Sequence, residues 1–588
     1  MNGCYSSVQT PMRLRTIFCT ALLILVICIV LPPFVMLFIG SLWGGAPGGP
    51  GEISLRAYTQ AYSSPHTYQV LLNSLFVSTA KTIIALAWGV VLAWLVARTD
   101  VPLKRLIEIL MPLPFFIPAL FTAFAWILLA NPTSGLINQL AVQFFNLDSP
   151  PFNIYSFGGM IFVMGLGSTS FVYLLTFGAF RGLDPSLEES ARTCGADGVQ
   201  TFIRITLPLV APALFGAFIL SFIRGIEAFE SPVLLGTPVG IYVFTNEIYR
   251  AITFRDPPQY GVATALGMTV MVITLALVLI QWRVLGQRQY FTITGKGFNP
   301  RTIALRGWRW PAFGVFALYF LLAIALPLGQ LIVSSLQSVP GVYSLDVFTL
   351  DNYRRAFEDD IVLRALKNTI LLAIGASVIG VLLSALIAYV TTRTQYRLRR
   401  VLDLICWLPW TMPGIVLAIG ILWAYLTIPG LSIFYATIWI LLIVYIIKGL
   451  PLGVRALSGT LVQVHQELED CARVFGANWL QSFSYILLPL IRPGMLAGGI
   501  LFAYVAVRDL ATPILLYGYG SEVLSIVMLM FWSQQKNQQI VSVLAIVMLL
   551  LLTGLSALQR WLLIAEKKSA AAEAQPAEKS AVAEPMHG

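Results

Sequence analysis

Two segments of this sequence share one spacing of acidic, small, glycine and proline residues. In each, an acidic residue precedes two small residues, a glycine lies four positions after the second of these, and the pattern Ile-x-Leu-Pro begins ten positions after the glycine. The first copy consists of Glu189, Ser190, Ala191, Gly195, Ile205, Leu207 and Pro208, and the second of Asp470, Cys471, Ala472, Gly476, Ile486, Leu488 and Pro489. The sequence holds no HExxH zinc motif and no GxSxG nucleophile elbow. We therefore expect these residues to form a docking surface rather than a catalytic centre.

The segment around the first copy has the features of a helix, a turn and a second helix. Asp184 is a favourable N-cap, and Pro185 is a favourable first helical residue. Glu188 and Glu189 fall in the first turns, where the helix dipole favours negative charge. Gly195 suits the end of the helix, where the chain turns through a left-handed conformation. We expect a helix–turn–helix block whose small residues let another surface approach closely.

The rest of the chain consists mainly of apolar stretches that must position these two blocks. Of the 588 residues, 58% are hydrophobic and 11% are charged, whereas soluble domains carry about 25% charged residues. A helix crosses a bilayer with about 20 mostly apolar residues. Twelve such stretches are centred near Val26, Leu86, Ala119, Val172, Phe215, Val272, Phe320, Gly380, Ile419, Ile443, Leu496 and Met548. The predicted fold class is therefore an all-α membrane protein with about twelve transmembrane helices.

The net charge of +10 is concentrated in short loops between the apolar stretches. The loop after the sixth stretch carries Arg283, Arg288, Lys296, Arg301, Arg306 and Arg309 and no acid, and basic residues also follow the second and eighth stretches. By contrast, residues 131–156, after the third stretch, include no Lys or Arg. Cytoplasmic loops are rich in these residues, so we expect the even-numbered connections and both termini to be cytoplasmic. This placement explains the charge without a nucleic-acid partner.

The two halves of the chain repeat one another. Four pairs of residues share an offset of 295, namely Asn73 with Asn368, Arg98 with Arg393, Pro114 with Pro409, and Pro118 with Pro413. Farther along the offset is 281, as for Pro208 with Pro489, which places 14 additional residues in the external loop after the third stretch. Each half has six spans and therefore enters and leaves on one side. The repeat is parallel, with a pseudo-twofold axis along the membrane normal.

These patterns divide the chain into five parts. They are a cytoplasmic N-terminus at 1–16, a first six-helix half at 17–284 with its block at 183–208, a basic cytoplasmic linker at 285–310, a second six-helix half at 311–565 with its block at 464–489, and a cytoplasmic tail at 566–588. The tail is rich in Ala, Glu and Lys, holds two prolines and lacks apolar periodicity. We predict that it is disordered.

The duplicated block resembles the EAA loop of ABC importer permeases. The resemblance covers nearly the whole chain, because each six-helix half carries one copy before its fifth helix. It implies the ABC type I importer permease fold and a transport subunit of the bacterial inner membrane that is not itself an enzyme. In that family the loop forms a coupling helix that lies in a groove of a cytoplasmic ATPase. The partners implied are a homodimeric ABC ATPase, a periplasmic substrate-binding protein and membrane lipid, with no cofactor and no bound metal.

This chain departs from the family pattern in both copies of the loop. Ser190 and Cys471 stand where alanine is usual, Asp470 replaces glutamate, and His465 lies at the N-cap position of the second copy. These differences put equal coupling of the two loops in doubt. The string TITGKGF has Gly297 where a P-loop needs Ser or Thr, so ATP hydrolysis is expected in a separate subunit.

The fused format, with two loops in one chain, is most similar to ferric-iron-type permeases, which makes ferric iron the expected substrate. Related permeases of the same class take 2-aminoethylphosphonate, thiamine or polyamines. A twelve-span secondary transporter driven by an ion gradient would share the parallel halves. It would not need the paired loops, so it is the less favoured alternative.

Charged residues after the fifth helix of each half are candidates for the transport path. They are Arg224, Glu227 and Glu230 in the first half and Arg508 and Asp509 in the second. Ionisable side chains near the membrane interior are costly and usually functional. We expect them either to line the path, to form Arg–acid pairs at the outer rim, or to contact the binding protein. Lys81, in the second helix, is expected to snorkel outward.

Overall fold

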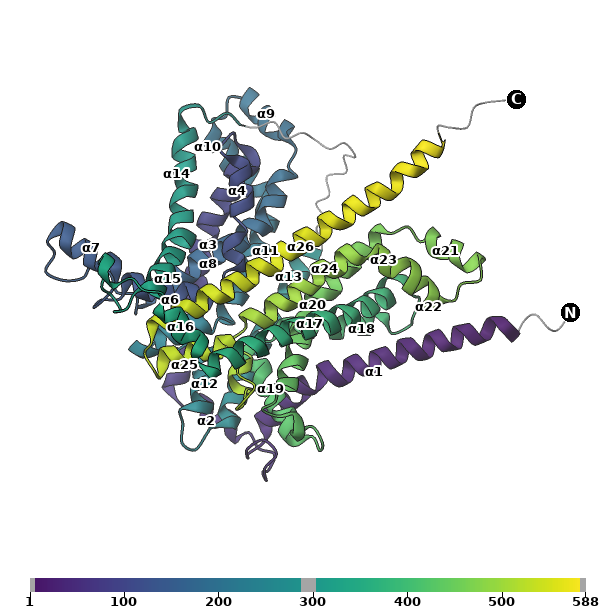
Figure 1. Ribbon diagram of the computed structural model, residues 1–588, viewed down its shortest axis with the longest axis horizontal. Helices are drawn as coiled ribbons and strands as arrows, with labels where there is room; N and C mark the ends of the chain where they lie inside the picture. The colour runs from purple at the N-terminus through teal and green to yellow at the C-terminus, as the bar shows by residue number, and fades with distance from the viewer. Residues whose placement is uncertain (1–5, 287–302, 582–588) are drawn as a thin grey trace.

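The computed structural model describes residues 6–286 and 303–581, and these ranges form a bundle of long helices joined by shorter ones (Figure 1). Nine of the described helices are long and apolar enough to cross a membrane. Three further pairs of helices, each bent at a break, bring the total to as many as twelve. The predicted all-α membrane fold with about twelve spans is therefore confirmed.

The spans of the two halves follow one another in the same order. The first half contains α1 (Ser6–Leu42), α3 (Pro65–Arg98), α4 (Lys104–Leu110) with α5 (Leu113–Phe116) and α6 (Ala119–Ala130), α8 (Phe157–Arg181), α11 (Leu207–Ile226) and α13 (Tyr260–Gly286). The second contains α14 (Arg309–Phe320) with α15 (Leu326–Leu336), α17 (Asp360–Arg393), α18 (Arg399–Trp407) with α19 (Gly414–Thr427), α20 (Ile438–Gln463), α24 (Arg492–Arg508) and α26 (Gln538–Ala581).

The remaining helices are short and lie at the ends of the spans. On one side of the bundle are α9 (Pro185–Thr193), α10 (Gly198–Thr201), α21 (Glu467–Val474), α22 (Trp479–Gln481) and α23 (Leu488–Leu490), together with the first turns of α1 and the last turns of α26 (Figure 1). On the opposite side are α2 (Arg56–Tyr62), α7 (Leu136–Phe145), α12 (Phe244–Thr253), α16 (Asp351–Glu358) and α25 (Leu524–Ser533) (Figure 1).

Each half is built around three inner helices, and its first span crosses to the other half. α3 packs against α8 and α11, and α17 packs against α20 and α24, whereas α1 packs along α19 and α15 packs against α6. Glycines allow the crossing helices to approach closely. A Cβ atom on Gly40 would lie 2.6 Å from the ring of Trp423, and Gly420 faces the backbone of Pro33. The two halves are therefore interleaved.

Two spans that the sequence predicts as continuous helices are broken at the equivalent place in each half. The helices on either side of Ile117–Pro118 are bent by 94°, and those on either side of Met412–Pro413 by 113°. A proline disfavours the helical conformation in the residue before it, and Ile117 and Met412 have extended ψ angles of 125° and 123°. The span near Leu496 is also bent, by 75°, between α23 and α24.

The C-terminal tail differs from the prediction. The tail was expected to be disordered from Glu566, but α26 continues to Ala581. Alanine, glutamate and lysine are strong helix formers, so this composition extends a helix already started in the last span. Residues 582–588, and 287–302 of the linker, lie outside the described residues. Ile303, the first described residue after 287–302, donates its amide hydrogen to the Arg98 carbonyl at 2.8 Å.

Candidate functional site

Both helix–turn–helix blocks form on the same side of the bundle (Figure 1). α9 and α21 each end at a glycine with positive φ, +89° at Gly195 and +84° at Gly476. The amide after each glycine donates back to the last turn of the helix, Ala196 to Ala191 at 3.1 Å and Ala477 to Ala472 at 3.0 Å. This is the left-handed helix end that the sequence predicts. We call the two blocks the first and second coupling loops.

The residues of the two patterns divide into an outward and an inward group. Exposed are Glu189, Ser190, Gly195 and Pro208 in the first loop and Asp470, Cys471 and Gly476 in the second, whereas Ala191, Ile205, Leu207, Ala472, Ile486, Leu488 and Pro489 are half-buried. The acidic position, the first small position and the glycine of each pattern thus face away from the bundle. The Ile-x-Leu-Pro positions join each loop to its fifth span.

A buried ion pair that the sequence analysis missed fixes each coupling loop to the bundle. In the first half the guanidinium of Arg98, at the end of α3, lies 2.5 Å from Glu188 Oε2 and donates to the carbonyl of Leu183. In the second half Arg393 lies 3.6 Å from Glu469 Oε1. Glu188 and Glu469 share the offset of 281, so the repeat itself could have revealed them.

The two coupling loops differ in how they begin and in what they expose. Asp184 accepts a hydrogen bond from the Ser186 amide at 2.9 Å, and the Ser186 amide and hydroxyl together lower the pKa of the Asp184 carboxyl. At the end of its helix the second loop presents Val474 and Phe475, with 85% and 91% of their surfaces exposed. The first loop has Thr193 and Cys194 at these positions. The second loop therefore exposes the more apolar surface at the end of its helix.

Lys81 lies inside the first half, not at its edge. It is the seventeenth of the 34 residues of α3 and is buried. Its ammonium donates to the Ser221 carbonyl at 2.6 Å and to the hydroxyls of Ser221 and Ser168, both at 3.2 Å. The expectation that Lys81 snorkels outward is wrong, because α8 and α11 cover this face of α3 and supply the hydrogen-bond acceptors.

The equivalent place in the second half is apolar. By the offset of 281, Ser221 corresponds to Phe502 and Ser168 to Gly449. Phe502 is fully buried and its ring contacts the positions of Gly449 and Gly453, so that a Cβ atom on Gly453 would lie 2.5 Å from it. The first half thus holds a polar cluster at the place where the second half holds an aromatic ring between two glycines.

The second half has a half-buried cation of its own, at a different position. Lys448 lies near the middle of α20, and its ammonium is 2.8 Å from Asp509 Oδ1 and 3.1 Å from the Thr512 hydroxyl. Asp509 was considered as an outer-rim partner of an arginine, but its partner is Lys448. The predicted path residues therefore lie near the middle of the spans.

The two predicted arginines meet where the halves touch. The Arg224 guanidinium carbon lies 4.8 Å from the ring centre of Phe171 and 5.4 Å from that of Phe115. Arg508 donates to the Tyr504 hydroxyl, which donates to the Phe115 carbonyl at 2.7 Å. In the described ranges neither guanidinium forms an ion pair with a carboxylate within 4.0 Å. Aromatic faces, rather than acids, are their immediate neighbours.

Two carboxylates of this region have unpaired oxygens. Within the part of the chain that the structure describes, Glu227 Oε1 and Asp509 Oδ2 are buried without a hydrogen-bond partner. Glu227 lies within electrostatic reach of Arg224, Lys448 and Lys81, and Glu230 within reach of both arginines. Buried polar atoms are nearly always hydrogen-bonded. The two free oxygens are therefore unusual among buried polar atoms.

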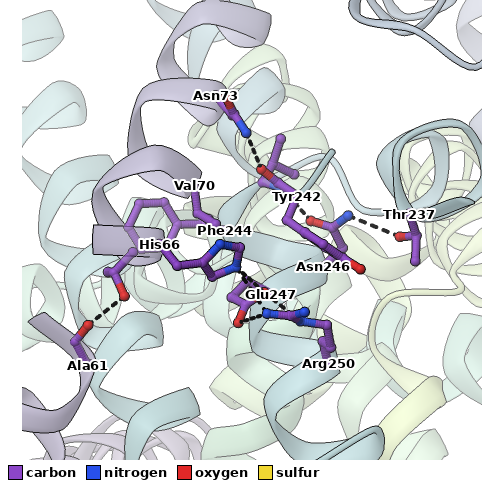
Figure 2. Close-up of polar contacts among 12 residues, drawn as sticks. Ala61, His66, Val70, Asn73, Thr237, Tyr242, Phe244, Asn246, Glu247 and Arg250 are labelled. Carbon is purple, nitrogen blue, oxygen red and sulfur yellow. Dashed lines mark hydrogen bonds and ion pairs between the residues drawn. The ribbon is translucent and has the colours of Figure 1, made fainter. Parts of the chain in front are cut away.

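On the opposite side of the bundle, polar contacts tie the start of α3 to the loop after α11 (Figure 2). Asn73 donates to the Tyr242 carbonyl at 3.0 Å, and its repeat partner Asn368 donates to the Glu522 carbonyl at 2.9 Å. Figure 2 also shows the guanidinium of Arg250 in contact with both Glu247 and His66, and this guanidinium lies over the Tyr242 ring. Each inner helix, α3 or α17, therefore joins its coupling loop to the opposite side.

Two interleaved six-span halves, each with a coupling loop, define an importer permease. The family model for "Binding-protein-dependent transport system inner membrane component" matches residues 85–289 and 380–563, so the chain belongs to this family of multi-pass inner-membrane permeases. The putative ferric transport system permease protein FbpB 1 of Haemophilus influenzae is 26% identical over 482 residues, or 81% of this chain and 74% of that protein.

A further relative and a solved structure are similar to parts of this chain. The ferric transport system permease protein FbpB of Actinobacillus pleuropneumoniae is 26% identical over 492 residues, which cover 81% of this chain and 68% of that protein. Among solved structures, a bacterial ABC transporter involved in the import of the acidic polysaccharide alginate is 20% identical over 48% of this chain and 99% of that chain, with a TM-score of 0.41.

Removing one partner of the buried Arg98–Glu188 pair should destabilise the permease. Glu188→Gln leaves a buried guanidinium beside a neutral amide, and breaking a buried pair in this way costs about 3–5 kcal/mol. We expect a lower temperature of thermal unfolding in detergent than for wild type. Glu189→Gln, at the neighbouring exposed position, is the control and should unfold close to wild type.

A double replacement separates the ion pair from a general loss of packing. Arg98→Met with Glu188→Leu removes both charges, and an apolar pair of similar volume is often as stable as a buried ion pair. This variant should therefore unfold at a higher temperature than Glu188→Gln alone. Equal unfolding temperatures for wild type and Glu188→Gln would contradict the structural role given to the pair.

Proposed function

We propose that this chain is the permease subunit of a ferric-iron importer. The observation that carries the proposal is the similarity to ferric transport permeases over 81% of this chain, a span longer than either half. A periplasmic binding protein delivers the substrate, and a homodimeric ATPase binds the two coupling loops and hydrolyses ATP. The permease itself supplies the path and no chemistry.

In this proposal the side of the bundle that carries α9 and α21 is cytoplasmic. The N-terminus at 1–16, the linker at 285–310 and the tail at 566–588 all belong to this side, and 17–284 and 311–565 are the two permease halves. The basic residues of the linker support this orientation. So does the exposure of Glu189 and Ser190 in the first coupling loop and of Asp470 and Cys471 in the second, which leaves these residues accessible to an ATPase.

α3 and α17 are the elements best placed to transmit movement of the coupling loops. Each is a continuous helix of 34 residues. Arg98 and Arg393 join the ends of these helices to the coupling loops. On the opposite side of the bundle, Asn73 and Asn368 join the same helices to the loops after the fifth spans. When the two ATPase subunits close on ATP, they draw the loops together, and both helices tilt as rods. This gives alternating access on the two sides of the membrane.

Replacing the two coupling-loop glycines should uncouple transport. A side chain at Gly195 or Gly476 is strained by the positive φ, at about 1–2 kcal/mol for each position, although the space around both glycines is open. Gly195→Leu with Gly476→Leu should reduce uptake at least tenfold and loosen the ATPase in pull-down experiments. Measurements of membrane insertion should match wild type, because neither position contacts the bundle.

Gly198→Leu provides the matched control on the same loop. Gly198 also has open space around it, but it begins α10 with an ordinary helical φ. It should retain uptake and ATPase binding. Normal uptake in the double glycine variant would disprove the docking role of the two loops.

The charged residues near the middle of the spans are proposed to line the translocation path. Four cations, Lys81, Arg224, Lys448 and Arg508, surround three acids, Glu227, Glu230 and Asp509. The cations repel a bare ferric ion, so the unpaired oxygens of Glu227 and Asp509 supply the attractive points for a cationic substrate. Their depth beside Lys81, near the middle of α3, favours path lining over contact with the binding protein.

Neutralising one of these acids should impair transport without detaching the ATPase. We expect Glu227→Gln to lower the rate of uptake about tenfold, because the path loses its unpaired anionic oxygen, while pull-down of the ATPase is unchanged. Glu52→Gln is the control, since Glu52 is an exposed acid in a loop between spans. Unchanged uptake by Glu227→Gln in a correctly inserted protein would exclude this residue from the path.

Substrate choice can be tested directly in cells or proteoliposomes that contain the whole transporter. Labelled ferric iron should be taken up in an ATP-dependent manner, and an excess of 2-aminoethylphosphonate, thiamine or spermidine should not compete. Competition by one of these three compounds, with no uptake of iron, would replace ferric iron by that substrate. Uptake that follows an ion gradient without ATP would overturn the importer class.

A further inference from the structure

An open apolar groove runs along the second half, between α17, α24 and α26, on the side of the coupling loops. Its volume is about 820 Å³. Aliphatic side chains of all three helices line it, among them Ile374, Val378 and Leu382 of α17, Met495 of α24, and Leu555 and Leu558 of α26. α24 and α26 lie side by side here (Figure 1). A groove of this size leaves apolar surface that packing within the described chain does not fill.

The groove exists because two large side chains of the first half are small in the second. By the offset of 281, Gly499 and Ala503 on α24 correspond to Phe218 and Phe222 on α11. Those two rings stack with centres 6.0 Å apart, and Phe218 packs against the buried Ile219, Ile223 and Val278. In the second half both Gly499 and Ala503 line the groove instead. The same surface is thus filled in one half and hollow in the other.

One end of the groove is basic. Arg492 is the first residue of α24, directly after the second coupling loop, and it lines the groove while remaining exposed to solvent. In the described ranges it forms no ion pair with a carboxylate. Its counterpart in the first half is Ala211. Apolar walls that lead to a free guanidinium match a molecule with a hydrocarbon chain and an anionic oxygen group.

We propose that this groove binds one phospholipid with an anionic headgroup. An acyl chain lies along Gly499 and Ala503 between the three helices, and the lipid phosphate binds the Arg492 guanidinium. The groove begins beside the second coupling loop and ends near Ala373, close to the middle of α17. It therefore spans one leaflet, the leaflet on the ATPase side. Basic pockets between spans on this side of a membrane suit anionic lipid headgroups.

The position of this lipid makes the two coupling loops unequal. α24 starts at Arg492 and follows the second loop directly, whereas its counterpart α11 carries Phe218 and Phe222 at the positions of Gly499 and Ala503. A bound lipid fills the space between α24 and α26 and holds the start of α24 in place. The lipid site is independent of which substrate is transported, because no residue of the groove belongs to the charged cluster near the middle of the spans.

The test measures retained lipid on the full-length permease by native mass spectrometry. The purified protein is stripped in detergent and then offered phosphatidylglycerol or phosphatidylcholine with the same acyl chains. We expect wild type to retain one phosphatidylglycerol and at least tenfold less phosphatidylcholine. Arg492→Ala should lose the preference for phosphatidylglycerol. Gly499→Phe with Ala503→Phe, which copies the first half, should retain neither lipid.

The filled variant has a matched control, and its Gly499 position has space for a side chain. A Cβ atom at Gly499 meets its neighbours at 3.6 Å or more, an ordinary contact distance, so the new ring can turn into the groove. Gly554→Phe places a ring on an exposed face of α26 outside the groove and should bind lipid as wild type does. Equal retention of both lipids by wild type, unchanged retention by the filled variant, or a second permease chain bound at the groove would each overturn the proposal.

Discussion

The Arg98 guanidinium is fully buried at the inner end of α3, and the side chain that neutralises it belongs to the first coupling loop. Taking a guanidinium out of water costs several kcal/mol unless a charged partner and further hydrogen bonds replace the water. Glu188 and the Leu183 carbonyl supply these, and the Thr206 hydroxyl donates to the second oxygen of Glu188 at 2.7 Å. If the coupling loop separated from α3, the Arg98 guanidinium would lose its charged partner. The position of the loop on the bundle is fixed by this requirement.

Charges removed from water must also be compensated near the middle of the spans, and the two halves do this with different residues. The first half solvates Lys81 with the carbonyl and hydroxyl of Ser221, whereas the second pairs Lys448 with Asp509. Two identical subunits would have to carry the same residues at both places. Because the halves are fused, each position can change separately. The buried polar cluster around Ser221 and the buried ring of Phe502 are products of that freedom.

Sequence reasoning was sufficient for features that repeat along the chain and weaker for features that depend on which face of a helix is covered. The spans, the duplicated loops and the glycine turns follow from apolar length, spacing and local conformation. Lys81 was misjudged because an apolar stretch does not tell which side of a helix faces lipid. The burial of Lys81 depends on α8 and α11, which are distant in sequence.

Other differences have physical causes that the sequence contained in part. Pro118 and Pro413 were visible as a repeated pair, yet the length of the apolar stretch favoured a continuous span over a break of 94° or 113°. Glu188 was noted only for its place near the helix dipole, because the pattern centred on Glu189, the exposed neighbour. The role of Glu188 needs the three-dimensional approach of α3. The composition of the tail indicated disorder, but alanine, glutamate and lysine also extend a helix that has already begun.

The proposed movement of the coupling loops acts differently on the continuous helices and on the broken spans. α3 and α17 are continuous, and each is fixed at its inner end by a buried ion pair and along its outer part by an asparagine. A rod fixed in this way tilts as one body. The breaks at Ile117–Pro118 and Met412–Pro413 interrupt the hydrogen bonding of the neighbouring spans, since proline has no amide hydrogen to donate. α15 and α1 of the opposite half pack against α6 and α19, so the proposed movement of the coupling loops turns α6 and α19 together with that opposite half.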